Sequence, residues 1–104
     1  MGKVFWSDPA IEDLRQVVEH IAQDSATYAE RFGVLLLASD KRLEDFPRSG
    51  RVVPEFEDAN IRELIYGSHR VIYIIRPEHC HIVAIVHASR DITRHLAPGD
   101  WNIE

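Results

Sequence analysis

The fold is decided by the stretch IRELIYGSHRVIYIIR, which runs from Ile61 to Arg76. It holds two runs rich in β-branched and aromatic residues, and Gly67-Ser68 separates them. Two such runs joined by a glycine-containing dipeptide predict a β-hairpin. A third run of the same kind follows the turn residues Pro77-Glu78-His79. We therefore expect an antiparallel meander with strands over 61–66, 69–76 and 81–88.

Upstream of this meander the apolar residues change to helical spacing. A short apolar run, 4–6, ends at Ser7-Asp8-Pro9, where serine or aspartate can cap a helix and proline fits the first turn. Helical periodicity then covers 10–22, and it resumes after the capping pair Asp24-Ser25 to continue as far as Phe46. These two patterns predict a strand followed by two amphipathic helices, which should form an antiparallel hairpin.

The second helical pattern has a wide apolar stripe. Val34, Leu35 and Leu37 are expected to broaden this stripe in its middle, and Pro47 with Gly50 is expected to end the helix. The segment 48–60, with its prolines and acidic residues, is expected to be a loop.

Together these elements predict one α+β domain spanning 1–104. A short N-terminal strand precedes an antiparallel helical hairpin, which packs on one face of an antiparallel β-sheet. The last two strands are almost continuously apolar, so both sheet faces are expected to be at least partly covered. The pattern leaves open whether a partner covers the second face.

The composition excludes several classes of protein. The chain has 104 residues, 45% hydrophobic and 28% charged, which is typical of a globular domain. A single cysteine excludes an intramolecular disulfide. The motif His79-Cys80-His81 contains possible metal ligands, but no third and fourth ligands lie nearby in the sequence, so we expect no metal and no cofactor. The apolar runs are too short to span a membrane and the first residues turn polar at once, which predicts a cytoplasmic protein without a signal peptide or membrane partner.

The positive charges are unevenly distributed. The formal net charge is −5, which argues against binding nucleic acid by bulk attraction alone. Every lysine-or-arginine position from 51 onward is nevertheless an arginine, whose planar fork suits phosphates and carboxylates. The meander should bring several of these arginines and a histidine together at its strand ends, namely Arg62, Arg70, His87 and Arg90, with Arg94 and His95 as further candidates.

Residue chemistry leaves three interpretations of this group open. The arginines could pair with acidic residues of the fold, Arg62 with Glu63 or Glu55 and Arg70 with Glu78 or Asp91. They could instead bind acidic residues of a partner. With a histidine to move a proton, they could also stabilise the phosphate during RNA cleavage.

Several short motifs, taken in order, resemble the ParE branch of the RelE/ParE superfamily, the toxins of bacterial type II toxin–antitoxin modules. The resemblance covers about residues 3 to 95 and rests on the following segments: Trp6-Ser7-Asp8-Pro9-Ala10, Asp13-Leu14, Leu43 to Pro47, Gly50 to Glu55, Ile61 to Leu64, His69 to Tyr73 and Val86 to Asp91. It implies the same element order that the periodicity predicts.

The resemblance also implies a partner, a cognate antitoxin whose C-terminal segment wraps the toxin. An amphipathic antitoxin helix would suit an apolar groove beside the helical hairpin, rimmed by arginines. DNA would be bound only indirectly, through the antitoxin.

The superfamily contains two activities. ParE-like members inhibit DNA gyrase and have no established catalytic site, whereas RelE-like members cut mRNA on the ribosome with basic residues and a tyrosine or other proton-transfer group. This chain is acidic and has no tyrosine after Arg90, which favours a gyrase inhibitor that is not an enzyme. The alternatives are a ribosome-dependent endoribonuclease and a non-toxic co-repressor that binds the antitoxin.

The gyrase-inhibitor and ribonuclease hypotheses each assign their own site residues. The partner-binding residues are expected to be Arg51, Arg62, Arg70, Arg90 and Arg94. We expect no catalytic residue in a gyrase inhibitor, but a ribonuclease would use Arg62, Arg70, His87, Arg90 and His95.

Overall fold

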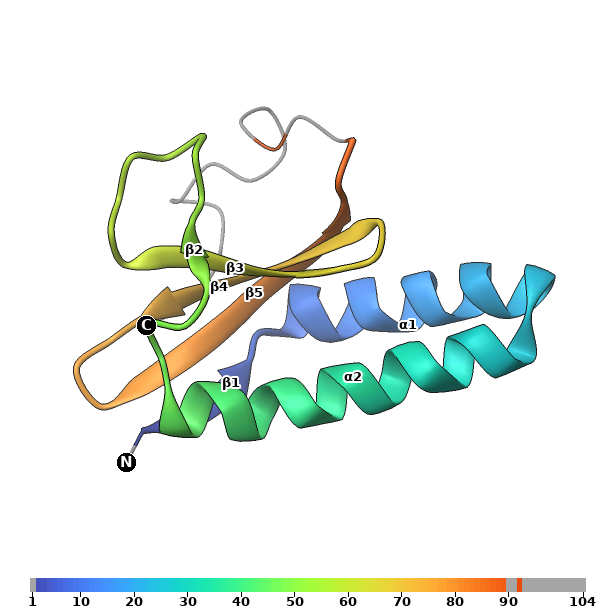
Figure 1. Cartoon of the computed structure of the whole chain (residues 1–104), viewed down its shortest axis with the longest axis horizontal. Coiled ribbons are helices and arrows are strands. Elements are labelled where there is room, and N and C mark those ends of the chain that lie inside the picture. The colour runs from blue at the N-terminus through green and yellow to red at the C-terminus, as the bar shows by residue number, and fades with distance from the viewer. Residues whose placement is uncertain (1, 90–91, 93–104) are drawn as a thin grey trace.

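The predicted meander forms the middle of a five-stranded sheet in the computed structural model, which describes residues 2–89 and 92 (Figure 1). Its strands are β3 (Ile61–Tyr66), β4 (His69–Ile75) and β5 (His79–His87), and they pair antiparallel. Two short strands complete the sheet, β1 (Lys3–Trp6) beside β5 and β2 (Arg51–Val52) beside β3, in the order β1-β5-β4-β3-β2. The α+β fold expected from the sequence is confirmed.

Two features of the sheet differ from the expectation. β1 pairs with β5 in parallel, so the sheet is mixed, although most of its pairs are antiparallel. This pairing also starts β5 two residues earlier than expected, because Lys3 lies opposite His79. β2 lies inside the segment expected to be a loop, since two residues are too few to give a periodic signal.

The two predicted helices begin at serine caps. The Ser7 hydroxyl accepts a hydrogen bond from the Ala10 N–H at the start of α1 (Asp8–Asp24). The Ser25 hydroxyl accepts one from the Tyr28 N–H at the start of α2 (Ala26–Asp45). These bonds satisfy N–H groups that have no partner within the helix. The sequence left serine or aspartate open as the cap of each helix, and the structure shows that it is the serine in both.

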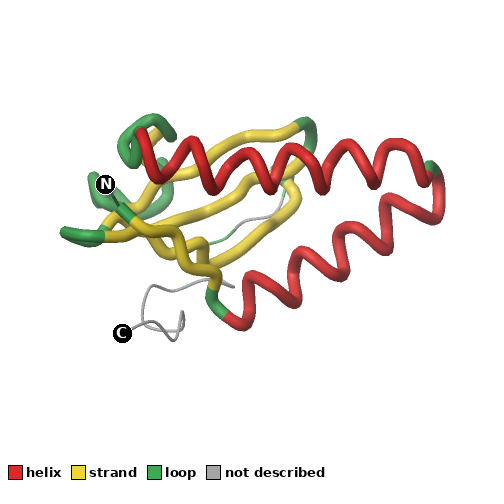
Figure 2. Tube along the Cα trace, turned by 90° about the horizontal axis from the view of Figure 1, so that it is seen from below, coloured by secondary structure: helices red, strands yellow, loops and turns green. Residues whose placement is uncertain are grey.

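The helical hairpin lies on one side of the sheet, and its closed end extends beyond the strands (Figure 2). The core between helices and sheet includes Phe32, Leu36 and Leu43 of α2 together with Val71 and Ile82. The α2 stripe is narrower than expected, because Val34, Leu35 and Leu37 are 60%, 45% and 75% exposed. The expectation that these three residues broaden the buried stripe is wrong, and Phe46 is exposed as well.

The chain itself covers much of the second sheet face. Val53 and Phe56, from the segment between β2 and β3, pack there with Ile92 against residues such as Ile72 and Ile74. Both faces of the central strands are thus covered, as their nearly continuous apolar sequence predicts.

None of the helices described is long and apolar enough to cross a membrane.

Two glycines provide a matched test of this packing. A Cβ added at Gly50 would lie 2.6 Å from both the Glu63 carbonyl oxygen and the Tyr73 hydroxyl, whereas one added at Gly33 in α2 meets nothing within 4 Å. We expect Gly50→Ala to lower the free energy of unfolding by about 2–3 kcal/mol through overpacking. Gly33→Ala should raise it by about 0.5–1 kcal/mol, because alanine reduces the conformational entropy of the unfolded chain.

Urea denaturation of the two variants measures both changes. Similar shifts for the two substitutions, or a stabilised Gly50→Ala, would contradict the close approach of Gly50 to β3 and β4.

Candidate functional site

An apolar groove runs between the two helices. We call it the hairpin groove, and its apolar wall consists mainly of Ile11, Leu14 and Val18 from α1 with Gly33, Val34 and Leu37 from α2. Its volume is about 550 Å³. Exposed apolar side chains gathered in one groove, rather than scattered singly, are typical of an interaction surface.

The groove follows from four consecutive apolar residues, Val34-Leu35-Leu36-Leu37. Because successive helical residues are about 100° apart, four in a row cannot all face the core. Leu36 packs against the sheet, while Val34 and Leu37 remain exposed at the groove. Gly33 adds no side chain, so the crevice beside α1 stays open. This unbroken apolar run is the sequence signal that could have revealed the groove.

The charged groups on the groove wall are acidic. Glu30 and Asp40 both line it, and the Trp6 Nε1–H donates a hydrogen bond of 3.0 Å to an Asp40 carboxylate oxygen. Among the described residues that line the groove there is no arginine, and the arginine rim expected from the sequence stays a prediction. Its charge would instead suit a partner with basic residues beside apolar ones.

The predicted arginine Arg70 is part of a buried charge network. Its Nη1 and Nη2 lie 2.9 and 2.8 Å from the two Glu55 carboxylate oxygens, and its Nε lies 2.5 Å from Glu63. The other Glu63 oxygen pairs with Arg51. The side chain of Arg70 is only 5% exposed and that of Glu63 is 0% exposed. The hydrogen bonds that Arg70 donates to Glu55, and then those that it donates to Glu63, raise the pKa of its guanidinium above the usual value.

Arg70 therefore pairs within the fold, but with different residues from those expected. Glu78 lies in the β4–β5 turn, and Asp91 lies outside the described residues. Glu55 comes from the segment covering the second sheet face, and no sequence spacing indicated that it would reach β4. Glu63 and Glu55 are thus site residues that sequence reasoning missed as partners of Arg70.

Arg62 binds backbone carbonyls instead of carboxylates. Its Nε donates to the Ala59 carbonyl at 2.8 Å, and its Nη1 donates to those of Arg48 and Gly50 at 3.2 and 3.1 Å. Successive side chains of a strand point to opposite faces, which separates Arg62 from its sequence neighbour Glu63. Arg62 thus holds the segment before and after β2, and its expected pairing with Glu63 or Glu55 is wrong.

The remaining predicted residues are spread along the chain. His87 lies opposite His69, with ring centroids 5.5 Å apart, whereas Arg62 lies opposite Tyr73, four residues farther along β4. Four strand residues span about 13 Å, so His87 and Arg62 do not meet. Burial, followed by the nearby His87 and His20, lowers the pKa of His69. Arg90, Arg94 and His95 lie outside the described residues.

The described part of the chain offers no cluster of three histidine, cysteine, aspartate or glutamate side chains that could hold a metal ion. The His87 Nδ1 accepts from the Ser89 N–H at 3.2 Å and lies 2.8 Å from the Ser89 hydroxyl. This ring is therefore engaged in a local turn after β5.

Three comparisons with known proteins agree with this fold. Residues 4–92 match the model of a family described as ParE toxin of type II toxin–antitoxin system, parDE. A protein named Toxin RelE2, from Caulobacter vibrioides, is 33% identical over 91 residues, which cover 86% of this chain and 99% of that protein. A solved structure titled chromosomal ParDE TA system from P. aeruginosa matches with a TM-score of 0.68, covering 86% of this chain and 98% of that one, at 17% identity.

The charge network predicts unequal costs for removing its two arginines. We expect Arg70→Met to lower the free energy of unfolding by about 3 kcal/mol, because it leaves buried carboxylate charge without its partner. Arg51→Met should cost less, about 1–2 kcal/mol, because the Arg51 side chain is 58% exposed and Arg70 still pairs with the buried Glu63.

Thermal or urea unfolding of both variants measures this difference, and 1 M NaCl should leave the Arg70 effect largely intact. Equal costs for the two variants would contradict the buried position of Arg70.

Proposed function

The chain belongs to the ParE toxin family of type II toxin–antitoxin systems, and from this membership we propose that it inhibits DNA gyrase by binding. A cognate antitoxin keeps it inactive by laying an amphipathic helix in the hairpin groove. In this proposal the toxin binds both gyrase and the antitoxin in the cytoplasm. DNA contact is indirect and is made through the antitoxin.

The observation that carries the inhibitor proposal is the engagement of Arg62 and Arg70 inside the fold. Arg70 is saturated by two carboxylates, and Arg62 is held by three backbone carbonyls. Neither guanidinium is free to stabilise the extra charge of a phosphate undergoing cleavage, as a ribonuclease would require. A formal net charge of −5 also opposes close approach to ribosomal RNA. These features favour action by binding over cleavage.

The exposed arginine of the network is the best candidate among the described residues for contact with gyrase. Arg51 lies on the edge strand β2 and is 58% exposed, next to the exposed Val52. Its Nε pairs with Glu63, which fixes the side chain. Contacts through Arg90 and Arg94 stay predictions, as does any contact through the buried Arg70.

The hairpin groove supports the antitoxin part of the proposal. Residues Glu30 to Asp40 of α2 span about 15 Å along the helix axis, which matches about three turns of a second helix. An amphipathic helix with apolar residues three and four apart fits such a groove. Glu30 and Asp40 on its wall favour lysine or arginine flanking that apolar stripe.

The groove proposal predicts the effect of a charge on its wall. Leu37→Glu should weaken antitoxin binding about 10- to 100-fold, because a leucine side chain loses its burial against the partner. The fold should be unaffected, since Leu37 is 75% exposed in the free toxin. The control is Ile65→Glu, which adds the same charge on the exposed part of β3.

Binding of purified toxin to its antitoxin, and rescue of growth when both are expressed, measure this effect. Unchanged affinity for Leu37→Glu, or equal weakening by Ile65→Glu, would contradict the groove as the antitoxin site.

The gyrase proposal predicts inhibition of DNA supercoiling by purified gyrase, with cleaved DNA accumulating as the toxin concentration rises. Arg51→Ala should inhibit more weakly than the unmodified chain, whereas Leu37→Glu should inhibit equally well because it alters only the antitoxin site. Added antitoxin should restore supercoiling for the unmodified chain.

Two results would replace this proposal. Unaffected gyrase together with codon-periodic cuts in translated mRNA would favour the ribosome-dependent endoribonuclease. Unaffected gyrase with normal growth after expression of the toxin alone would favour a co-repressor that binds the antitoxin.

A further inference from the structure

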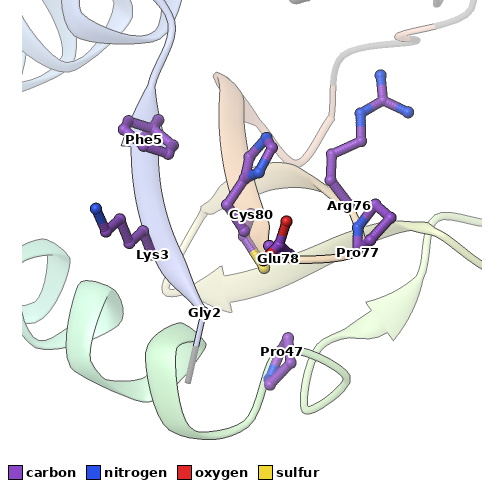
Figure 3. A pocket seen from close by; sticks show the side chains of 9 residues that line it. Gly2, Lys3, Phe5, Pro47, Arg76, Pro77, Glu78 and Cys80 are labelled. Atoms are coloured by element: carbon purple, nitrogen blue, oxygen red, sulfur yellow. The ribbon is translucent and has the colours of Figure 1, made fainter.

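A second hollow lies at the β1 edge of the sheet, away from the hairpin groove. We call it the β1-edge pocket; its wall includes Lys3, Phe5, Pro47, Arg76, Glu78 and His79. Figure 3 shows Lys3 and Phe5 on β1 at one side of the opening, with Arg76 and Pro77 at the other and Glu78 between them. Its volume of about 490 Å³ lies within the range of about 300–1,000 Å³ that is usual for small-molecule sites.

The parallel pairing of β1 with β5 assembles this pocket. Lys3 lies opposite His79, and Phe5 lies opposite His81. The alternate residues Val4 and Cys80 belong to the core beneath the helices, and Cys80 also lines the pocket. Because strand side chains alternate between faces, Lys3, Phe5, His79 and His81 share the face turned away from the helices. Sequence reasoning could not assemble this group, since it did not foresee β1 beside β5.

Two cationic side chains, Lys3 and Arg76, belong to the pocket wall together with one carboxylate, Glu78. Lys3 and Arg76 form no ion pair among the described residues, and Glu78 is the acidic side chain on the wall. His81 lies next to this wall, and its buried Nδ1 has no hydrogen-bond partner. Burial, then the nearby His79 and Arg76, lower the pKa of His81. These groups would gain from an anion placed among them.

An exposed aromatic ring adjoins the positive charge. Phe5 is 46% exposed, and its ring centroid lies 5.4 Å from that of His79 and 5.5 Å from that of His81. The His79 ring stands nearly perpendicular to Phe5, at 82°, whereas the His81 ring is tilted by 31°. An exposed ring held in this way offers a surface on which a planar base can stack.

We propose that the β1-edge pocket binds a nucleoside monophosphate, with the phosphate between Lys3 and Arg76 and the base against Phe5. His79 donates a further hydrogen bond to the phosphate, and the Glu78 carboxylate accepts hydrogen bonds from ribose hydroxyls. This site lies on a different part of the molecule from the hairpin groove, so it extends beyond the proposed function and does not depend on it.

The experiment titrates the full chain separately with AMP, inorganic phosphate and adenosine by calorimetry, and follows the His79 and His81 imidazole resonances by NMR. We expect AMP to bind about tenfold more tightly than either fragment, because only AMP uses both the cations and the ring. The two imidazoles should shift on AMP binding, whereas His20 on α1 should not.

Variants separate the two halves of the site. Arg76→Gln should weaken AMP binding about tenfold, the effect of losing one charge-assisted contact. Phe5→Leu should remove the advantage of AMP over inorganic phosphate. Lys41→Gln removes the same charge from the exposed side of α2 and should leave AMP affinity unchanged.

Three results would overturn the proposal. The first is inorganic phosphate or adenosine binding as tightly as AMP. The second is Lys41→Gln weakening AMP as much as Arg76→Gln, which would indicate attraction by overall charge. The third is no AMP binding at millimolar concentration. Arg76 is exposed, so its variant should fold, and a thermal melt of Phe5→Leu checks that variant.

Discussion

The fold depends on a buried carboxylate, Glu63, held between two arginines. Arg70 on the neighbouring strand contacts one of its oxygens and Arg51 on β2 contacts the other. Arg70 also binds Glu55, so the network ties the segment before β3 to the centre of the sheet. Buried charge of this kind is costly unless each group is paired and hydrogen-bonded, which explains why two glutamates surround Arg70. Arg62 reinforces the same connection through the carbonyls of Ala59, Arg48 and Gly50.

This connection decides which surfaces remain for partners. The tied segment brings Val53 and Phe56 over the sheet face opposite the helices, where they cover the central strands. The apolar side chains that stay exposed are then found largely on the hairpin, above all Val34 and Leu37. A toxin of this family has an antitoxin as its partner, and under the proposed function the hairpin groove would give that partner an apolar surface without opening the core. In the same proposal, the acidic residues Glu30 and Asp40 on the groove wall favour a partner with basic flanks.

The same network bears on the choice between binding and cleavage. A guanidinium that stabilises a reacting phosphate has to be available when the extra charge develops. Of the arginines that the sequence placed at the strand ends, Arg62 and Arg70 donate hydrogen bonds within the fold, while the cations Lys3 and Arg76 line the β1-edge pocket. Arginine content alone therefore does not indicate catalysis. What matters is which guanidinium groups already have carboxylate or carbonyl partners.

The sequence by itself determined both helices, four of the five strands and their order along the chain. Local signals sufficed for this: the serine caps of both helices, the Gly67-Ser68 turn, and apolar spacings that change from helix to strand after Asn60. Only the tertiary structure decided the parallel partner of β1, the pairing of Arg70 with Glu55 and the outward position of Val34 and Leu37. The physical reason is the distance along the chain over which each interaction acts. Caps, turns and periodicity depend on neighbours within a few residues, whereas a salt bridge, a sheet edge or a groove depends on segments that only the folded chain brings together.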